Sequence, residues 1–245
     1  MLKDRYALVT GATSGIGSAI CTELAKLNCN IIIHYNSNED KANLLKEELI
    51  SKYSVKCMTI KCNLENESEI NNLFEEVKFV DILVNNASLE LNSDLLDKTK
   101  ESFNKTLNIN LVAPFLLSKH YGKIMYDNKW GRIINISSNN ALNKYDPVTL
   151  EYDASKVGLI SLTHNLAKYF SPYISVNAVC PGWIMSDKVK SLNDNLDGML
   201  ELEESKNILK QRFGEVDEVA RLVAFLCLND YINNETIRID GGTLW

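Results

Sequence analysis

Short apolar runs rich in branched residues alternate along the chain with longer stretches whose apolar residues recur three and four positions apart. The short runs predict buried β-strands, and the longer spacing is that of one buried helix face. The expected strands cover 6–10, 30–35, 55–61, 80–84, 132–138, 174–179 and 235–239, and the expected helices cover 17–27, 39–52, 67–77, 95–126, 152–170 and 216–228. This alternation predicts an α/β fold, a doubly wound parallel sheet of seven strands with helices on both faces.

Three glycines follow the first expected strand at once, in the segment Gly11-Ala-Thr-Ser-Gly-Ile-Gly17. Strand, glycine-rich turn and helix aim backbone N–H groups at a phosphate, and glycine lets a pyrophosphate approach the backbone closely. A plain strand-to-helix turn needs only one glycine. The spacing therefore predicts a Rossmann-type dinucleotide site within a single binding and catalytic domain over 1–245. The residues expected to line this part of the site are Gly11, Thr13, Ser14, Gly15 and Ile16.

The end of the second expected strand bears on the choice of dinucleotide. A carboxylate here would accept a hydrogen bond from the 2′-hydroxyl of NAD and repel the 2′-phosphate of NADP. Tyr35, Asn36 and Ser37 supply none, and the first acidic residue comes only at Glu39. We expect NADP, with NAD as the alternative, since no arginine marks the position. His34 is expected to be an ordinary strand residue.

Polar and turn-forming residues follow the third, fourth and sixth expected strands as well. Ligands of parallel sheets bind at the carboxyl ends of the strands, so these turns are expected to share one edge with the glycines. The further cofactor contacts expected there are Asn63, Leu64, Asn86, Ala87, Pro181, Gly182, Ile184 and Ser186.

Tyr152 and Lys156 lie four positions apart in an expected helix, so their side chains share one face. A nearby ammonium favours the phenolate and lowers the pKa of the phenol from its usual value of about 10. Tyr152 is therefore a candidate proton donor and acceptor near neutral pH. A solvated surface pair is the alternative. Ser138 ends the fifth strand, and the loop after it is long enough to fold back toward Tyr152.

Two stretches of the chain depart from simple patterns. The long expected helix 95–126 contains Pro114, which is expected to kink it and to free backbone carbonyls. Asn110 in that helix is expected either to stabilise the helix as a polar residue or to hold a water.

The charged segment 186–212, called here the lid segment, is expected to be a mobile lid over the substrate, with a solvated loop without function as the alternative.

Composition narrows the classes of partner. The 245 residues are 45% hydrophobic with a formal charge of -6, and no basic stripe stands out, so we expect no nucleic-acid partner. No signal peptide opens the chain and no apolar run approaches the ~20 residues that cross a bilayer, so we expect a cytoplasmic protein without membrane association. The cysteines are scattered without a companion histidine cluster. We therefore expect reduced thiols and no metal site.

Taken together, these motifs resemble the short-chain dehydrogenase/reductase family over essentially the whole chain. Thr10-Gly11-x-x-x-Gly15-Ile-Gly17 is similar to the family's cofactor loop, and Asn85-Asn-Ala87 to its central strand signature. The residues that match its catalytic tetrad, in the family's order, are Asn110, Ser138, Tyr152 and Lys156. Pro181-Gly182, Arg212-Phe-Gly-Glu and Asp240-Gly-Gly match its nicotinamide turn and its C-terminal part.

The resemblance implies hydride transfer between a nicotinamide and a carbonyl or alcohol. Tyr152 would give a proton to the carbonyl oxygen and Ser138 would hold that oxygen. Lys156 would bind the nicotinamide ribose and lower the tyrosine pKa, while Asn110 would anchor a water that links Lys156 to solvent. Homotetramers are the family habit, assembled through the long central helices and the C-terminal strand region.

Within the family the chain looks most like bacterial 3-oxoacyl-acyl carrier protein reductases. This implies a small carbonyl substrate, a 3-oxoacyl thioester carried on acyl carrier protein, and a part in fatty acid biosynthesis. Ser88 departs from the usual glycine, and Ser14 stands where those reductases usually carry an arginine near the 2′-phosphate. The carrier protein is normally met by basic side chains beside the active site. Lys129 and Arg132 could serve, but Ser171-Pro-Tyr173 occupies the second expected basic patch.

Other readings of the substrate stay open. The Asn-Asn-Ala-Ser form is also similar to pteridine reductases, although Gly15 and Ser138 stand where those enzymes carry an arginine and an aspartate. The polar run 139–144 would suit a polar substrate or form an exposed loop. A dehydrogenase or reductase of a sugar, polyol, pterin or other small carbonyl compound is the alternative, and a non-catalytic nucleotide-sensing protein on the same fold is the remote one.

Overall fold

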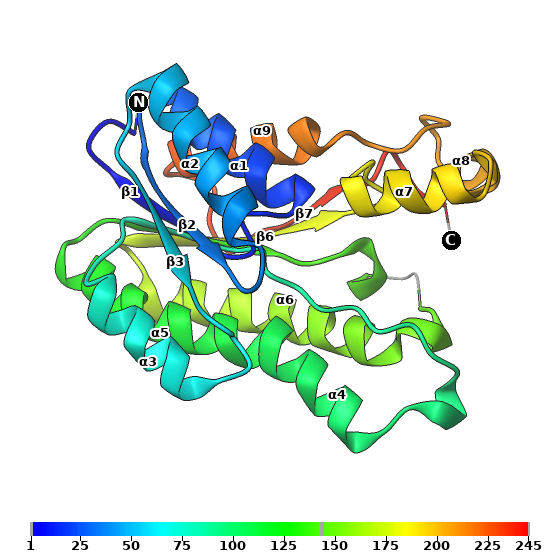
Figure 1. Ribbon diagram of the computed structural model, residues 1–245. Helices are drawn as coiled ribbons and strands as arrows, with labels where there is room; N and C mark the ends of the chain where they lie inside the picture. The colour runs from blue at the N-terminus through cyan, green and yellow to red at the C-terminus, as the bar shows by residue number, and fades with distance from the viewer. Residues whose placement is uncertain (1, 143–144, 245) are drawn as a thin grey trace.

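The computed structural model describes residues 2–142 and 145–244 and contains one parallel sheet in the order β3-β2-β1-β4-β5-β6-β7 (Figure 1). Its strands are β1 (Tyr6–Val9), β2 (Asn30–Tyr35), β3 (Cys57–Lys61), β4 (Ile82–Asn85), β5 (Gly131–Ile136), β6 (Ile174–Pro181) and β7 (Thr236–Ile239). Every neighbouring pair runs parallel. The predicted doubly wound parallel sheet of seven strands is confirmed.

Helices cover both faces of this sheet, as Figure 1 shows. One face carries α1 (Gly15–Lys26), α2 (Glu39–Tyr53) and α9 (Val216–Leu228), and the other carries α3 (Glu67–Glu76), α4 (Lys100–Leu107), α5 (Ala113–Asp127) and α6 (Leu150–Phe170). The side chains of strand β1 point alternately into the two helix-covered cores. Ala7 and Val9 join the core under α1, while Leu8 between them joins the core under α5.

The chain crosses from one half of the sheet to the other between β3 and β4. Strands β1 and β4 are neighbours, yet the connections that leave them run to opposite faces. The turns after β1 and β4 consequently both lie at the carboxyl ends of the strands, where they line one cleft. Such a switch point is where open α/β sheets bind their ligands.

The stretch expected as one helix over 95–126 is divided. Leu95–Asp97 forms a separate short turn, and α4 begins afresh because Thr99 and Ser102 cap it reciprocally. Residues Asn108–Val112 then form a π-helical segment, η2, which leads into α5. Pro114 lacks the N–H that an α-helix would direct to residue 110, and the wider turn accommodates this. The predicted irregularity near Pro114 is therefore a π-helical turn.

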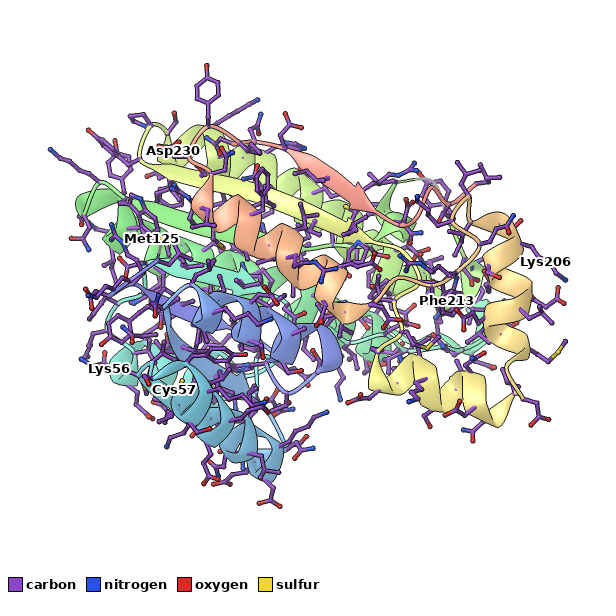
Figure 2. All side chains as sticks on the ribbon, turned by 90° about the horizontal axis from the view of Figure 1, so that it is seen from above. Lys56, Cys57, Met125, Lys206, Phe213 and Asp230 are labelled. Carbon is purple, nitrogen blue, oxygen red and sulfur yellow. The ribbon has the colours of Figure 1, made fainter. Side chains whose placement is uncertain are left out.

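The lid segment contains two helices that sequence analysis did not predict, α7 (Asp187–Asn195) and α8 (Met199–Glu204). Ser186 caps α7 by accepting a hydrogen bond from the N–H of Val189, and Gly198 provides the left-handed residue before α8. Figure 2, which labels Lys206 and Phe213 in this region, shows both helices to one side of the main body, while α9 lies beside α1. No helix among the described residues is long and apolar enough to cross a membrane.

Candidate active site

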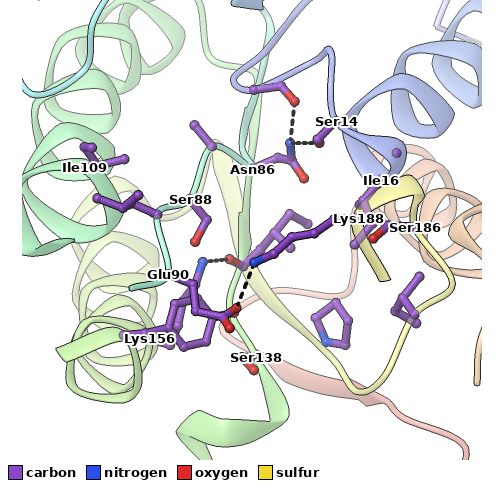
Figure 3. Close-up of a pocket in the computed structure, with 18 of the residues that line it drawn as sticks. Ser14, Ile16, Asn86, Ser88, Glu90, Ile109, Ser138, Lys156, Ser186 and Lys188 are labelled. Carbon is purple, nitrogen blue, oxygen red and sulfur yellow. Dashed lines mark hydrogen bonds and ion pairs between the residues drawn. The ribbon is translucent and has the colours of Figure 1, made fainter. Parts of the chain in front are cut away.

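A cleft of about 800 Å³ follows the carboxyl ends of the strands (Figure 3). It gathers turns that lie far apart in the sequence. The predicted site residues that line it are Gly11, Thr13, Ser14, Gly15, Ile16, Asn36, Ser37, Asn63, Leu64, Asn86, Ala87, Ser138, Tyr152, Lys156, Pro181, Gly182, Ile184 and Ser186. Tyr35 and Asn110 are the two predicted residues that are not part of this lining.

The turn after β1 is locked to the turn after β4. The Asn86 amide donates to the carbonyl of Thr10 at 2.8 Å and to that of Gly11 at 3.1 Å, and Figure 3 shows it reaching Ser14. Thr10 Oγ1 in return accepts from the N–H of Ala87 at 2.9 Å. Gly11 has a φ of +60°, and a Cβ there would lie 2.9 Å from Ala87 Cα. Glycine is therefore required at position 11 by conformation and by space.

The N-terminus of α1 opens into the same cleft. Ser14 accepts from the N–H of Gly17 at 3.1 Å. Within residues 2–142 and 145–244, no acceptor lies against the N–H groups of Gly15 and Ile16. Free amides at a helix N-terminus form an anion site, so these donors fit the diphosphate of a dinucleotide.

His34 has a larger part than the ordinary strand residue we expected. Its Nδ1 accepts from the N–H of Gly11 at 3.0 Å, so Nε2 must carry the proton, which it donates to the carbonyl of Cys62 at 3.0 Å. Burial lowers the pKa of His34 to about 4, which keeps the ring neutral in this arrangement. His34 thus fastens the glycine turn to the end of β3.

Tyr35 corrects our expectation for the end of β2. Side chains alternate along a strand, and because His34 faces the cleft, Tyr35 points the other way. Its ring is buried in the core on the α1 and α2 face. Asn36 and Ser37 remain the cleft-lining residues of this turn.

Tyr152, Ser138 and Lys156 meet at the other end of the cleft. Helix α6 carries Tyr152 and Lys156 on one face, with the Lys156 Nζ 5.4 Å from the centre of the Tyr152 ring. The ammonium donates to the carbonyl of Ile136 at 2.8 Å, which fixes it beneath the end of β5. Ser138 follows that strand, and its side chain hydrogen-bonds to Tyr152. Two predicted donors therefore face one point in the cleft.

The predicted direction of the Tyr152 pKa is wrong for this structure. Burial raises the pKa of the Tyr152 phenol, and the hydrogen bond of Ser138 only partly opposes that rise. Burial also lowers the pKa of Lys156 to about 8. Sequence spacing brings the two groups together, but it does not reveal how strongly both are desolvated. Tyr152 is consequently a protonated phenol at neutral pH.

Asn110 lies in η2 behind the cleft, with its side chain fully buried. Its Oδ1 accepts from the N–H of Leu89 at 2.7 Å, and its Nδ2 donates to the carbonyl of Leu89 at 2.8 Å and to Ser155 Oγ at 3.0 Å. Asn110 thereby ties the turn after β4 to the helix that carries Tyr152. Its predicted role of anchoring a water stays a prediction, and Oδ1 keeps one acceptor position beyond the bond from Leu89.

Two ion pairs across the cleft escaped sequence analysis. Lys188 lies 3.9 Å from a carboxylate oxygen of Glu90, and Lys41 lies 2.7 Å from one of Asp187. Figure 3 shows Glu90 and Lys188 meeting within the cleft. The signal available was position alone: Lys41 lies in the first turn after the second strand, and Glu90 follows Asn-Asn-Ala closely.

The polar loop after Ser138 lies partly in the site. Asn139 and Asn140 line the cleft, whereas Asn143 and Lys144 lie outside the described residues. Asp153 on α6 organises this loop by accepting from Asn140 Nδ2 at 2.9 Å and from the N–H of Asp146 at 3.0 Å.

Lys129 and Arg132 lie away from this cleft, contrary to the expectation that they flank it. They stand at the start of β5, and the cleft is at its carboxyl end. Arg132 is buried, stacks over Trp130 and donates to the carbonyl of Gly131. Within one subunit, these residues therefore face the opposite edge of the sheet. Among the described residues, no group of three or more His, Cys, Asp or Glu side chains is placed to hold a metal.

Comparison with known proteins bears on this geometry. Residues 5–197 match the short chain dehydrogenase family. The chain is 38% identical to a 3-oxoacyl-[acyl-carrier-protein] reductase of Rickettsia bellii (strain RML369-C), over 99% of this chain and 98% of that protein. It is 37% identical to the reductase of that name from Aquifex aeolicus (strain VF5), over 98% of both. A 3-oxoacyl (acyl-carrier-protein) reductase of Agrobacterium tumefaciens C58, solved with NADP bound, superposes with a TM-score of 0.92 at 26% identity, over 98% of this chain and 95% of that chain.

Proposed function

Because this chain belongs to the short chain dehydrogenase family, we propose that it is an NADPH-dependent oxidoreductase that reduces a ketone to a secondary alcohol. The proposed substrate is a 3-oxoacyl thioester carried on acyl carrier protein. The substrate follows the names of the relatives, and NADPH follows the neutral turn at Asn36 and Ser37 and the NADP in a similar structure.

The observation that carries this proposal is the meeting of Tyr152, Ser138 and Lys156 at one end of a cleft whose other end holds the glycine turn. A ketone gains negative charge on its oxygen as it is reduced. Preorganised donors that face this oxygen stabilise the charge in the transition state. When bound, the dinucleotide supplies the hydride, and Gly15, Ile16 and Lys156 are among the residues that would hold it.

The raised pKa of Tyr152 fits the reducing direction. A phenol that stays protonated at neutral pH has a proton to give to the substrate oxygen. Ser138 donates a hydrogen bond to the same oxygen and then to the phenolate left behind. Lys156, charged below about pH 8, stabilises that phenolate electrostatically.

A second candidate substrate class rests on the polar lining beside Tyr152. Asn139, Asn140 and Glu90 all face the cleft there and would hydrogen-bond hydroxyl or amide groups. A sugar, polyol, pterin or another small polar carbonyl compound would use these partners.

The test is NADPH consumption with acetoacetyl thioester presented on acyl carrier protein and on coenzyme A, with NADH as the cofactor control. We expect turnover that favours the carrier-protein form. Turnover only on sugars, polyols or pterins would move the enzyme to the second class. NADPH binding without reduction of any carbonyl would contradict the proposed activity itself.

We also propose that the chain assembles as a homotetramer through two interfaces, the face of η2, α5 and α6 and the C-terminal strand region. Val112, Phe115 and Val157 lie half-exposed on these elements, where a second copy of the chain would bury them. Gel filtration with light scattering tests this, and a monomer at micromolar concentration would contradict it.

A further inference from the structure

The adenosine end of the cleft lacks an obvious partner for the 2′-phosphate of NADPH. Asn36, Ser37 and Asn63 line it, and all are neutral. Of the described residues that line the cleft, the cationic ones are Lys41, Lys156 and Lys188. Lys156 is buried beside Tyr152, and Lys188 lies beside Glu90. Lys41 is thus the lining cation available near the turn after β2.

We propose that Lys41 recognises the 2′-phosphate of NADPH, and that Asp187 in the lid segment holds Lys41 and competes with the phosphate for it. The inference rests on the proposed NADPH dependence. It assigns the choice between NADPH and NADH to one ion pair that joins α2 to α7.

The position of Lys41 supports this assignment. It lies in the first turn of α2, where its N–H donates to Asn38 Oδ1 at 3.1 Å, directly after the turn of Asn36 and Ser37. Its Nζ extends to Asp187 Oδ2 at 2.7 Å. The residue before Asp187 packs against the glycine turn, because a Cβ on Gly15 would lie 3.2 Å from Ser186 Cβ. Lys41 therefore extends across the mouth of the cleft, from the turn after β2 toward the glycine turn after β1.

The pair of Lys41 and Asp187 is suited to exchange. The two side chains are 42% and 79% exposed, and ion pairs in such contact with water contribute little to stability. A phosphate carries more charge and more acceptor oxygens than a carboxylate, so it binds the same ammonium more strongly. The 2′-hydroxyl of NADH has no charge with which to displace Asp187. Only NADPH would break the pair.

The competition has a consequence that separates it from simple recognition. Asp187 lowers the affinity for NADPH, first by occupying Lys41 and second by repelling the phosphate. Removal of its charge should therefore improve the binding of NADPH and leave that of NADH unchanged. Release of Asp187 also breaks its own ion pair at the start of α7, while the ion pair of Lys188 and Glu90 remains.

The experiment measures equilibrium binding of NADPH, NADH and 2′,5′-ADP to the full chain, by calorimetry or by quenching of Trp183 in the cleft. Lys41→Met should weaken NADPH and 2′,5′-ADP by roughly tenfold or more and leave NADH within about twofold. Asp187→Asn should tighten NADPH by roughly threefold, with NADH unchanged. In the double variant the effect of Asp187→Asn should disappear, because its partner is gone.

Lys52→Met is the matched control, because Lys52 pairs with Glu48 at 2.7 Å near the far end of the same helix. It should leave all three affinities unchanged. Equal weakening of NADPH and NADH by Lys41→Met, or weaker NADPH binding by Asp187→Asn, would overturn the inference. Since 2′,5′-ADP needs no turnover, the expected pattern without any ketone reduction would reject the proposed activity and keep this inference. If the Lys41→Met enzyme reduces a ketone and binds NADPH with normal affinity, the inference about Lys41 is rejected and the proposed activity is kept.

Discussion

The catalytic end of the cleft and the lid segment are built in opposite ways. Around Tyr152 the polar side chains are buried and bonded to backbone, as Lys156 is to Ile136 and Asn110 is to Leu89. The lid segment touches the cleft mainly through exposed ion pairs, those of Asp187 and Lys188. Buried bonds fix geometry, whereas exposed pairs exchange easily. The comparison teaches that the catalytic side chains are held by buried hydrogen bonds, whereas the lid segment meets the cleft through ion pairs that can exchange.

The largest effect is expected from Tyr152→Phe, which removes the proton donor and keeps the ring. Turnover should fall by roughly a thousandfold, since general acid catalysis contributes on this scale. NADPH affinity should change little, because the glycine turn is untouched. Steady-state rates and cofactor binding together measure this. Near-normal turnover would show that another group supplies the proton.

A smaller effect on both rate and stability is expected from Asn110→Ala. The substitution leaves the N–H and carbonyl of Leu89 without their partner and should lower the free energy of unfolding by about 1–3 kcal/mol. Turnover should fall roughly tenfold as the turn after β4 shifts. Asn104→Ala on the exposed side of α4 is the control. Full activity with unchanged stability would remove Asn110 from the positioning of the site.

The smallest effect is expected from Glu90→Gln at the border of the two regions. The Glu90 carboxylate raises the pKa of Lys156, so its removal should lower that pKa from about 8. If the reaction needs charged Lys156, activity is lost as pH rises through the pKa of Lys156. In the variant this loss of activity should occur at a lower pH, with a shift of less than about one pH unit. Glu203→Gln on α8 is the control. An unchanged or upward-shifted alkaline limb would contradict the electrostatic link.

Much of the fold was accessible from the sequence because each element repeats its own pattern. Helix α9 matches its expected bounds, and β2 does as well. The strand ends were also foreseeable, since parallel strands bring their carboxyl ends to one edge. Most predicted cofactor and catalytic residues line the cleft for this reason. Their roles stay predictions until the variants are measured.

The failures have physical causes that a single sequence conceals. Side chains alternate along β2, so only one of His34 and Tyr35 can face the cleft. The hydrophobic pattern of the strand does not show which of the two it is. Spacing put Lys156 near Tyr152 but carried no information on desolvation, which reversed the expected direction of the tyrosine pKa. Ion pairs such as that of Lys41 and Asp187 join residues from distant elements, so no local pattern announces them.

The neutral ring of His34 has a consequence for proton uptake. In the unfolded chain this ring would bind a proton near pH 6.5. In the folded protein burial of the ring lowers that pKa to about 4, and its hydrogen bonds to backbone groups only partly oppose this effect. Above pH 6.5 the ring is neutral in both states and stability is unaffected. As pH falls from 6.5 toward 4, only the unfolded chain gains the proton, which costs the native state up to about 3 kcal/mol. At pH 5 the chain therefore releases the proton of the His34 ring when it folds.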